Sequence, residues 1–204
     1  MITEFVEFPK IPRLSRDMIV TEKIDGTNGC IFIGSAENPE FLVGSRTRWI
    51  TPETDNHGFA RWAYDHQSEL MGLGAGRHFG EWWGNGIQRG YGLPRGEKRF
   101  SLFNVTRWCL AVAAPQQIPT GDPRQVKMQD VLPPCVGLVP VLYRGPFSDP
   151  VVDALLINLR DFGSAAVPGF MQPEGVVIFH VGGNLMFKKT IQGDDAPKSA
   201  ARKP

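Results

Sequence analysis

Hydrophobic positions recur along the chain in short runs that alternate or continue over a few residues, as is typical of strands. Glycine, proline and asparagine separate the runs, so the pattern predicts strands joined by tight turns. The predicted strands cover residues 18–22, 30–33, 41–45, 78–83, 99–105 and 136–143. Two further runs, 175–179 and 184–189, flank Gly182-Gly183 and predict a hairpin.

Helical periodicity appears in two segments. In residues 57–73 the apolar side chains recur at roughly helical spacing, and Asp55 or Asn56 is placed to cap that helix. The second helix is expected to begin with Asp149 as its N-cap and a proline in its first turn, and to end at Gly163. Because strands dominate and the helices do not alternate with them, we expect an α+β domain of mostly antiparallel sheets with flanking helices.

Composition and charge narrow the classes of protein. The 204 residues fit one domain, expected over residues 1–193, followed by a polar tail over 194–204. The 22 basic and 21 acidic residues give a net charge of +1, which excludes nucleic-acid binding by bulk charge alone. A group of basic residues surrounds the glycine-rich tract. It could form a phosphate-binding surface, or it could be an ordinary solvated face. Its members are Arg61, Arg77, Arg89, Arg95, Lys98 and Arg99.

The sequence also bears on location. No apolar run approaches the ~18 residues that span a bilayer, and the first ten residues lack the apolar core of a secretory signal, so we expect no membrane association. Cys30, Cys109 and Cys135 are odd in number and lack the paired spacing of a zinc site or disulfide framework. The expected location is therefore the reducing cytoplasm.

The segment from Glu22 to Gly26 carries the most distinctive chemistry. Lys23 ends a predicted strand and is followed by Asp25 and Gly26, so its amine could serve as a nucleophile at a strand–loop junction. Gly26 would permit a tight backbone and close approach of a ligand. From these residues alone, the alternative is a solvated lysine in an ordinary Asp-Gly turn.

Lys23-x-Asp25-Gly26 resembles motif I of the covalent nucleotidyltransferase superfamily, which contains DNA ligases, RNA ligases and mRNA capping enzymes. Further segments resemble the remaining motifs in the family's order, so that the likeness spans residues 22–189. These segments are 44–46, 79–81, 100–105, 174–178 and 187–189. The surroundings of motifs I and III, residues 23–28 and 81–86, are most similar to RNA ligases that seal nicks in duplex RNA.

The resemblance implies an adenylyltransferase domain that acts as an ATP-dependent RNA ligase. Such an enzyme adenylates itself on Lys23, passes AMP to an RNA 5′-phosphate and joins that end to a 3′-hydroxyl. Lys188 and Lys189 would activate Lys23 and neutralise the phosphates, with Lys188 as the first lysine of its motif. Glu174 would help to hold Mg²⁺ or Mn²⁺, partly through water.

The resemblance also implies residues that bind the nucleotide. Glu81 would accept hydrogen bonds from a ribose hydroxyl, and Arg46 would bind ribose or substrate phosphate. Phe100 would stack on the purine, while Phe103, three residues on, would face the core. Glu22 would contact the exocyclic amine of adenine. Asp25 and Gly26 of motif I complete this set.

Three departures from the family pattern leave alternatives open. Asn104 stands where the family has Asp, and the two lysines of the last motif are adjacent. Only fifteen residues follow Lys189, so we expect no C-terminal OB-fold, and a partner protein would have to supply such a domain. The alternatives are a DNA ligase or a guanylyltransferase of the same superfamily, or a nucleic-acid-binding module that does not seal.

Overall fold

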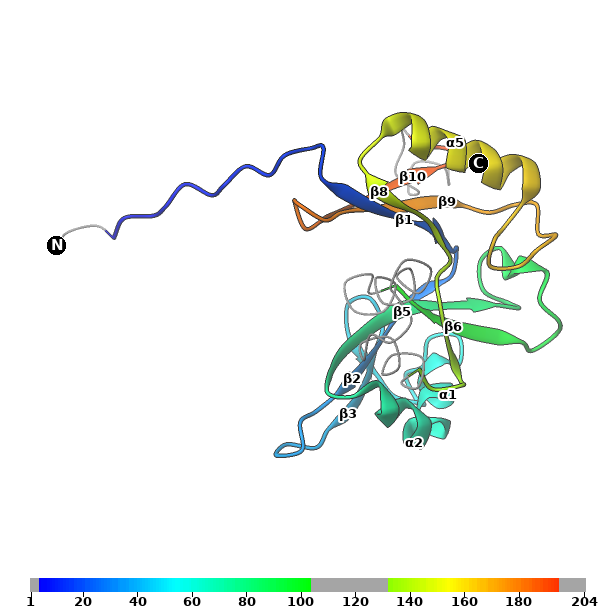
Figure 1. Ribbon diagram of the computed structural model, residues 1–204. Helices are drawn as coiled ribbons and strands as arrows, with labels where there is room; N and C mark the ends of the chain where they lie inside the picture. Colours follow the sequence, from blue (N-terminus) through cyan, green and yellow to red (C-terminus); the bar gives the residue numbers. More distant parts are fainter. Residues whose placement is uncertain (1–3, 104–131, 195–204) are drawn as a thin grey trace, which may run out of the picture.

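Two β-sheets, one of four strands and one of six, form the body of the molecule (Figure 1). The structure is a computed structural model, in which residues 4–103 and 132–194 are described. The pairs of neighbouring strands are antiparallel except for one, β6 with β7, within these residues. The α+β architecture with mostly antiparallel sheets is therefore confirmed.

The four-stranded sheet has the order β10-β9-β1-β8. Its strands are β1 (Asp17–Lys23), β8 (Val141–Pro146), β9 (Gly175–His180) and β10 (Leu185–Thr190). Helix α5 (Asp149–Phe162) covers one face and buries Val152 and Leu159 against the sheet. Its N-cap is Ser148, one residue before the predicted Asp149, whereas Gly163 ends the helix as predicted, with φ of 86°.

The six-stranded sheet has the order β4-β3-β2-β5-β6-β7. Its strands are β2 (Thr27–Ile33), β3 (Phe41–Gly44), β4 (Trp49–Ile50), β5 (Gly76–Gly84), β6 (Lys98–Leu102) and β7 (Val136–Leu138). The two residues of β4 are too few for an alternation signal. The predicted strand 136–143 is divided between β7 and β8, so it crosses from one sheet to the other.

One face of the six-stranded sheet is covered by short helical segments. They are α1 (Phe59–Asp65), α2 (Gln67–Leu70) and a 3₁₀ turn (Met71–Leu73). A single helix over 57–73 was the expectation, but the backbone of His66, with φ of −106° and ψ of 17°, breaks it. The N-cap residue of α1 is Gly58, but the Asp55 carboxylate accepts hydrogen bonds from the amides of Ala60 and Arg61 in the first turn.

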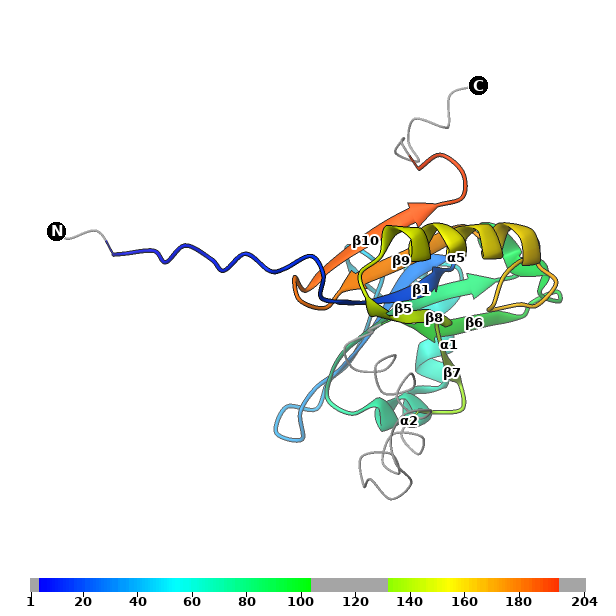
Figure 2. The same ribbon diagram turned by 45° about the horizontal axis from the view of Figure 1, so that its top comes forward.

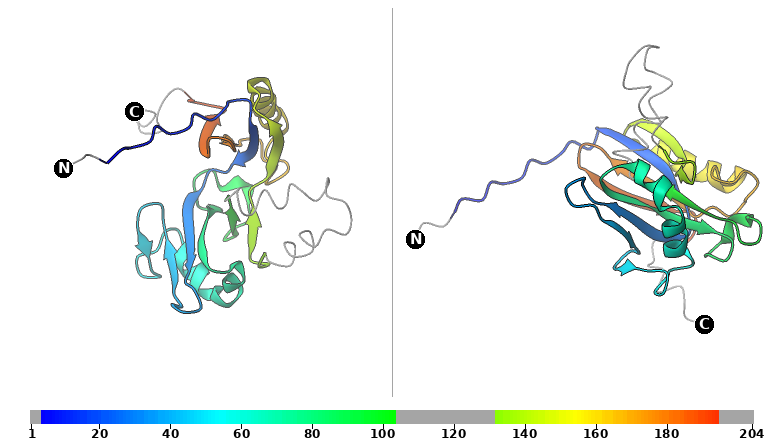
Figure 3. Two further views of the ribbon diagram at one scale, coloured as in Figure 1. Left: turned by 60° about the vertical axis from the view of Figure 1, so that its left-hand side comes forward. Right: turned by 90° about the horizontal axis from the view of Figure 1, so that it is seen from below.

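The two sheets meet at an apolar cluster that contains Ile24, Trp83, Tyr91 and Phe179. Tyr91 belongs to a short 3₁₀ turn, Gly90–Gly92. Figures 2 and 3 show the sheets from further sides, with the connection from β1 to β2 running between them. No helix in residues 4–103 and 132–194 is long and apolar enough to cross a membrane.

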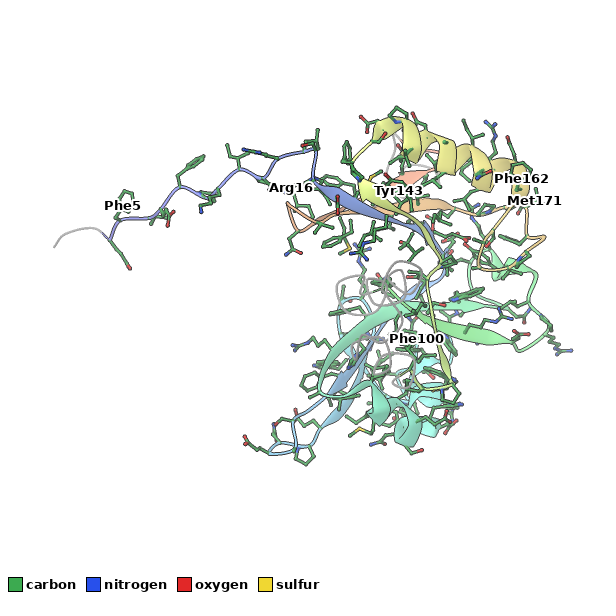
Figure 4. The ribbon with its side chains drawn as sticks, in the orientation of Figure 1. Phe5, Arg16, Phe100, Tyr143, Phe162 and Met171 are labelled. Atoms are coloured by element: carbon green, nitrogen blue, oxygen red, sulfur yellow. The ribbon has the colours of Figure 1, made fainter. Side chains whose placement is uncertain are left out.

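The chain before β1 is an extended arm that points away from the body, with Phe5 labelled near its free end (Figure 4). Within the described residues Cys30 and Cys135 are free thiols. Three predictions concern residues outside the described part of the chain. They are the end of the predicted strand 99–105, from Asn104 on; Cys109; and nearly all of the tail 194–204.

Candidate active site

Lys23 is the last residue of β1, the strand that lies between β9 and β8. The residues before it are buried, which fixes the strand, whereas the Lys23 side chain is 21% exposed. In the antiparallel register Lys23 lies opposite Gly175, so Glu174 enters the site just before β9 begins. Nζ of Lys23 lies 2.5 Å from Oε2 of Glu174, whose side chain is 2% exposed. Strand pairing thus joins the predicted nucleophile to the predicted metal ligand.

Asp25 lies in the turn that follows Lys23 and is held from two sides. Its side chain is 9% exposed and forms an ion pair with Arg89, with Nε at 3.0 Å from Oδ2. Its backbone amide donates to the Tyr91 hydroxyl at 3.0 Å. Burial raises the pKa of Tyr91, so this hydroxyl stays protonated. The turn is therefore fixed by the chain that follows β5.

Arg89 connects two parts of the site that are distant in sequence. Besides Asp25, its guanidinium donates to the carbonyls of Gln172 and Pro173, at 2.8 and 3.2 Å. These carbonyls precede Glu174 directly. The sequence placed Arg89 only in a loose basic set, because nothing in the local pattern shows that its fork of donors turns inward.

Glu81 leaves β5 on the side of the cavity and is held by β2 and the turn before it. Its two oxygens accept hydrogen bonds from the Gly26 amide and the Asn28 side chain, both at 3.1 Å. Burial raises the pKa of Glu81 to about 7, while the positive charge of Lys23 opposes the rise and Glu174 adds to it. Glu81 is therefore poised to change charge near neutral pH.

Glu22 is 1% exposed and anchors the loop after α5. Its carboxylate accepts hydrogen bonds from the Ser164 hydroxyl at 2.6 Å and from the amides of Ala165 and Ala166 at 2.8 and 2.9 Å. Burial raises its pKa, and these hydrogen bonds act against the rise. Glu22 also lines the cavity beside Lys23, and its hydrogen bonds hold this loop against β1.

A cavity of about 450 Å³ lies beside Lys23, within the size range of small-ligand sites. Both sheets contribute to its lining: β1 and its following turn, β2, β5, β9 and β10. Of the predicted site residues, the cavity is lined by Glu22, Lys23, Asp25, Gly26, Arg46, Glu81 and Lys188. Further lining residues include Asn28, Phe103, Val139, Phe179 and Met186. The structure therefore brings most of the predicted set together around one cavity.

The positions of Phe100 and Phe103 are the reverse of those expected. Phe100 is 1% exposed and packs in the core, 4.9 Å from Phe59 between ring centroids; Figure 4 labels it within the six-stranded sheet. It lies opposite Trp82 in the register of β6 with β5, on the face that α1 covers. Phe103 follows on the other phase of the alternation and lines the cavity.

The two lysines of β10 point to opposite faces because side chains alternate along a strand. Lys188 lines the cavity. Lys189 points away from it and pairs with Asp153 of α5, with Nζ at 2.6 Å from Oδ1. Of the two lysines expected to act in catalysis, Lys188 therefore lies at the cavity and Lys189 does not.

A divalent metal ion would find carboxylate oxygens near Lys23. Among residues 4–103 and 132–194 no group of three or more His, Cys, Asp or Glu side chains is arranged to hold a metal by itself. Mg²⁺ is often bound through one or two carboxylates together with substrate phosphates. The donors present, with Glu174 first, fit a metal ion that arrives with a nucleotide.

Comparison with known proteins identifies the family. The fold, the lysine at the end of β1 and the charged cavity define a nucleotidyltransferase-type domain. A family model described as RNA ligase matches residues 16–190. The chain belongs to the RNA ligase family, a branch of the covalent nucleotidyltransferase superfamily.

Solved structures with the same fold come from an RNA ligase of Naegleria gruberi. An apo mutant has a TM-score of 0.59 and 17% identity, over 87% of this chain and 50% of that one. A mutant with ATP and Mn has a TM-score of 0.58 and 18% identity, over 88% and 51%. A mutant with AMP and Mn has a TM-score of 0.57 and 17% identity, over 87% and 50%.

No curated protein matches this chain. The chain spans about half the length of the solved relatives it matches. At these identities the likeness shows the fold, which agrees with the expected adenylyltransferase domain.

Proposed function

We propose that this chain is the nucleotidyltransferase domain of an ATP-dependent RNA ligase, with Lys23 as the residue that carries AMP. The observation that supports it most is Nζ of Lys23 at the wall of the cavity, 2.5 Å from the buried carboxylate of Glu174. The solved relatives that were determined with ATP, AMP and Mn are consistent with such a site.

In the first step the Lys23 amine attacks the α-phosphorus of ATP. A nitrogen–phosphorus bond forms, the bond to the pyrophosphate oxygen breaks, and pyrophosphate leaves. A lysine amine attacks only after it has lost a proton. Oε2 of Glu174 is the nearest acceptor for that proton. A divalent metal bound there would neutralise phosphate charge and orient the α-phosphate.

The other residues around the cavity orient the nucleotide. Glu81 accepts hydrogen bonds from the ribose, and Phe103 offers an aromatic face for the base. Lys188 lies where positive charge stabilises the charge that develops on the phosphates. Arg46 is exposed at the mouth of the cavity and binds ribose or phosphate.

Two further steps complete the proposed reaction. The RNA 5′-phosphate attacks the phosphorus of lysyl-AMP, which frees Lys23 and forms a 5′-to-5′ pyrophosphate bond. The RNA 3′-hydroxyl then attacks the 5′-phosphate, a phosphodiester bond forms and AMP leaves.

The first test is label transfer from ATP labelled at the α-phosphate, with Mg²⁺ or Mn²⁺, followed by a denaturing gel. We expect label on the wild-type chain and none on Lys23→Ala. Lys189→Ala is the matched control, because this lysine points away from the cavity, and it should keep the label. Label from GTP alone would indicate a guanylyltransferase. No label from folded wild-type protein with either metal would contradict the proposal and leave a binding module.

The second test addresses sealing and strand preference. Nicked duplexes with RNA or DNA at the nick, and a single-stranded RNA, are offered to the labelled protein. We expect AMP to be transferred to RNA 5′-phosphates before ends are joined. Transfer to DNA ends alone would favour a DNA ligase.

A further inference from the structure

One face of the six-stranded sheet is not covered by the helices, and the burial of its side chains changes along the strands. In β2, Ile31 and Ile33 point into the core beneath α1, so Asn28, Cys30 and Phe32 point to the opposite face. At one end of that face Trp83 packs into the apolar cluster between the sheets. In the middle Asn28 and Glu81 line the cavity. Beyond them Cys30 is buried and Phe32 is half-buried, whereas Phe79 and Trp49 are exposed.

Aromatic side chains gather on this exposed end. In the strand register Cys30 lies opposite Phe79, and Phe32 lies opposite Arg77. Phe79 is 45% exposed, and Trp49, from β4, is 47% exposed. β4 and β5 are separated in the sheet by β3 and β2, and Phe32 of β2 lies between the two exposed rings. Exposed rings on one face of a sheet form an apolar surface of the kind that marks interaction sites. We call Phe32, Trp49 and Phe79, together with Arg77, the aromatic platform.

Contacts within the platform hold the rings in place. The Phe32 and Trp49 ring centroids are 6.1 Å apart, and Arg77 lies over the Phe32 ring with Cζ at 5.1 Å from its centroid. Trp49 lies opposite Gly44, where a Cβ atom would come within 3.1 Å of the indole. Glycine at this position therefore lets the Trp49 ring lie close to the sheet.

The backbone links the platform to the cavity at two places. Phe103, which lines the cavity, donates its backbone amide to the carbonyl of Phe79 at 3.1 Å. Arg46, also at the cavity, lies in the turn that leads into β4 and Trp49. The residues that face the platform from β2, β3, β4 and β5 are Cys30, Phe32, Leu42, Gly44, Trp49, Arg77 and Phe79, and none of them is acidic.

We propose that the aromatic platform binds a single-stranded end of RNA and leads it to the cavity. Bases would stack on Phe79 and Trp49, and backbone phosphates would lie against Arg77 and Arg46. Exposed aromatics flanked by arginines are the means by which proteins hold unpaired bases. A blunt duplex hides its base faces and so fits this surface poorly. The inference rests on the proposed function, since it names the substrate strand of the same site.

The test is the affinity of the full chain for a short, unstructured RNA strand, measured by fluorescence anisotropy without ATP. We expect Phe79→Ala and Trp49→Ala each to weaken binding about tenfold. Phe162→Ala is the matched control, because this ring is 76% exposed but lies at the end of α5, on the other sheet (Figure 4). It should bind like the wild type. Unchanged unfolding midpoints would show that the variants fold.

Salt dependence separates stacking from charge. Arg77→Gln should lower the slope of log Kd against log salt by about 0.7, the value for one phosphate contact on a single strand. Phe79→Ala should weaken binding with the slope unchanged. Equal slopes for Arg77→Gln and the wild type would contradict the phosphate contact.

Several results would overturn the platform. They are wild-type protein that does not bind the strand, platform variants that bind it as well as the wild type, and equal losses on a blunt RNA duplex. A change of oligomeric state in Phe79→Ala with unchanged RNA affinity would make the surface an interface between copies of the chain. Self-adenylation of the wild type without RNA is measured separately. If the wild type is labelled but the platform variants bind RNA normally, the platform is contradicted and the proposed ligase stands. If the wild type is not labelled but the platform variants lose RNA affinity, the proposed ligase is contradicted and RNA binding by the platform stands.

Discussion

The two sheets contribute different kinds of groups to the cavity. The four-stranded sheet supplies the amines of Lys23 and Lys188, and Glu174, just before β9, contacts Lys23. The six-stranded sheet supplies Asn28 and Glu81, and Phe103 follows directly after its strand β6. The difference suggests a division of work, in which one sheet carries the reaction at phosphorus and the other recognises the nucleoside. Substitutions in the four-stranded sheet should lower the rate of self-adenylation, and substitutions in the six-stranded sheet should lower the affinity for ATP.

The sharpest test within the six-stranded sheet compares its two faces. Phe100→Ala empties a buried core position and should lower the free energy of unfolding by about 4 kcal/mol. Phe103→Ala, which removes a ring from the cavity, should instead raise KM for ATP about tenfold with a smaller loss of stability. Urea unfolding and self-adenylation kinetics measure the two effects. A larger rise in KM for Phe100→Ala in folded protein would restore the original assignment.

Glu81 predicts a dependence of stability on pH. Its pKa is near the ordinary 4.5 of a glutamate when the chain is unfolded and about 7 when it is folded, so the folded state binds the extra proton between these values. The free energy of unfolding should therefore fall by about 3 kcal/mol as pH rises from 4.5 through 7. Glu81→Gln should remove this fall, although it loses one of two hydrogen bonds and starts lower. Parallel pH curves for the two proteins would contradict the assignment.

The adjacent lysines of β10 test the reaction side of the comparison. Lys188→Ala removes positive charge from the cavity and should slow self-adenylation about 100-fold, with a smaller change in KM. Lys189→Ala breaks an exposed ion pair with Asp153, so the rate should stay within twofold and stability should change little. Single-turnover labelling measures both rates. Equal losses in the two variants would show that the alternation along β10 does not determine their roles.

Arg89 tests whether the two sheets depend on a shared support. Arg89→Ala leaves the buried carboxylate of Asp25 without its ion pair with this guanidinium and should lower the free energy of unfolding by about 2 kcal/mol. Arg160→Ala is the control, since Arg160 lines the neighbouring hollow but pairs only at the surface with Asp161. Its effect on the free energy of unfolding should be too small to resolve. A similar loss in both variants would contradict the special position of Arg89.

The sequence predicted the strands and motifs well because these depend on local pattern. Strand alternation and turn residues located β1, β2, β5 and the final hairpin, and the resemblance to the family's motifs implied that Lys23, Glu81 and Glu174 share one site. The inward direction of Lys188 rather than Lys189 could not be read from sequence. The side chains of β10 are exposed or half-buried on both faces, so its hydrophobic pattern does not show which face points to the cavity.

Other features depended on pairing between distant segments. In the run 99–105, Phe100 and Phe103 belong to opposite faces of the strand. Only the register of β6 with β5 shows that Phe100 is the one that faces the core. Arg89 bridges residues that lie 64 and 83 positions away, at Asp25 and Gln172, so no local signal revealed it. The helix over 57–73 is broken at His66, where the apolar spacing alone predicts a continuous helix.

The central claim is that Lys23 carries AMP, and peptide mapping tests it most directly. The protein is incubated with ATP and Mg²⁺, digested, and analysed by mass spectrometry under conditions that preserve the phosphoramidate bond. The account predicts AMP on the peptide that contains Lys23, and none on the peptides that contain Lys188 or Lys189. AMP on another residue, or a wild-type protein that binds ATP without covalent AMP, would contradict it.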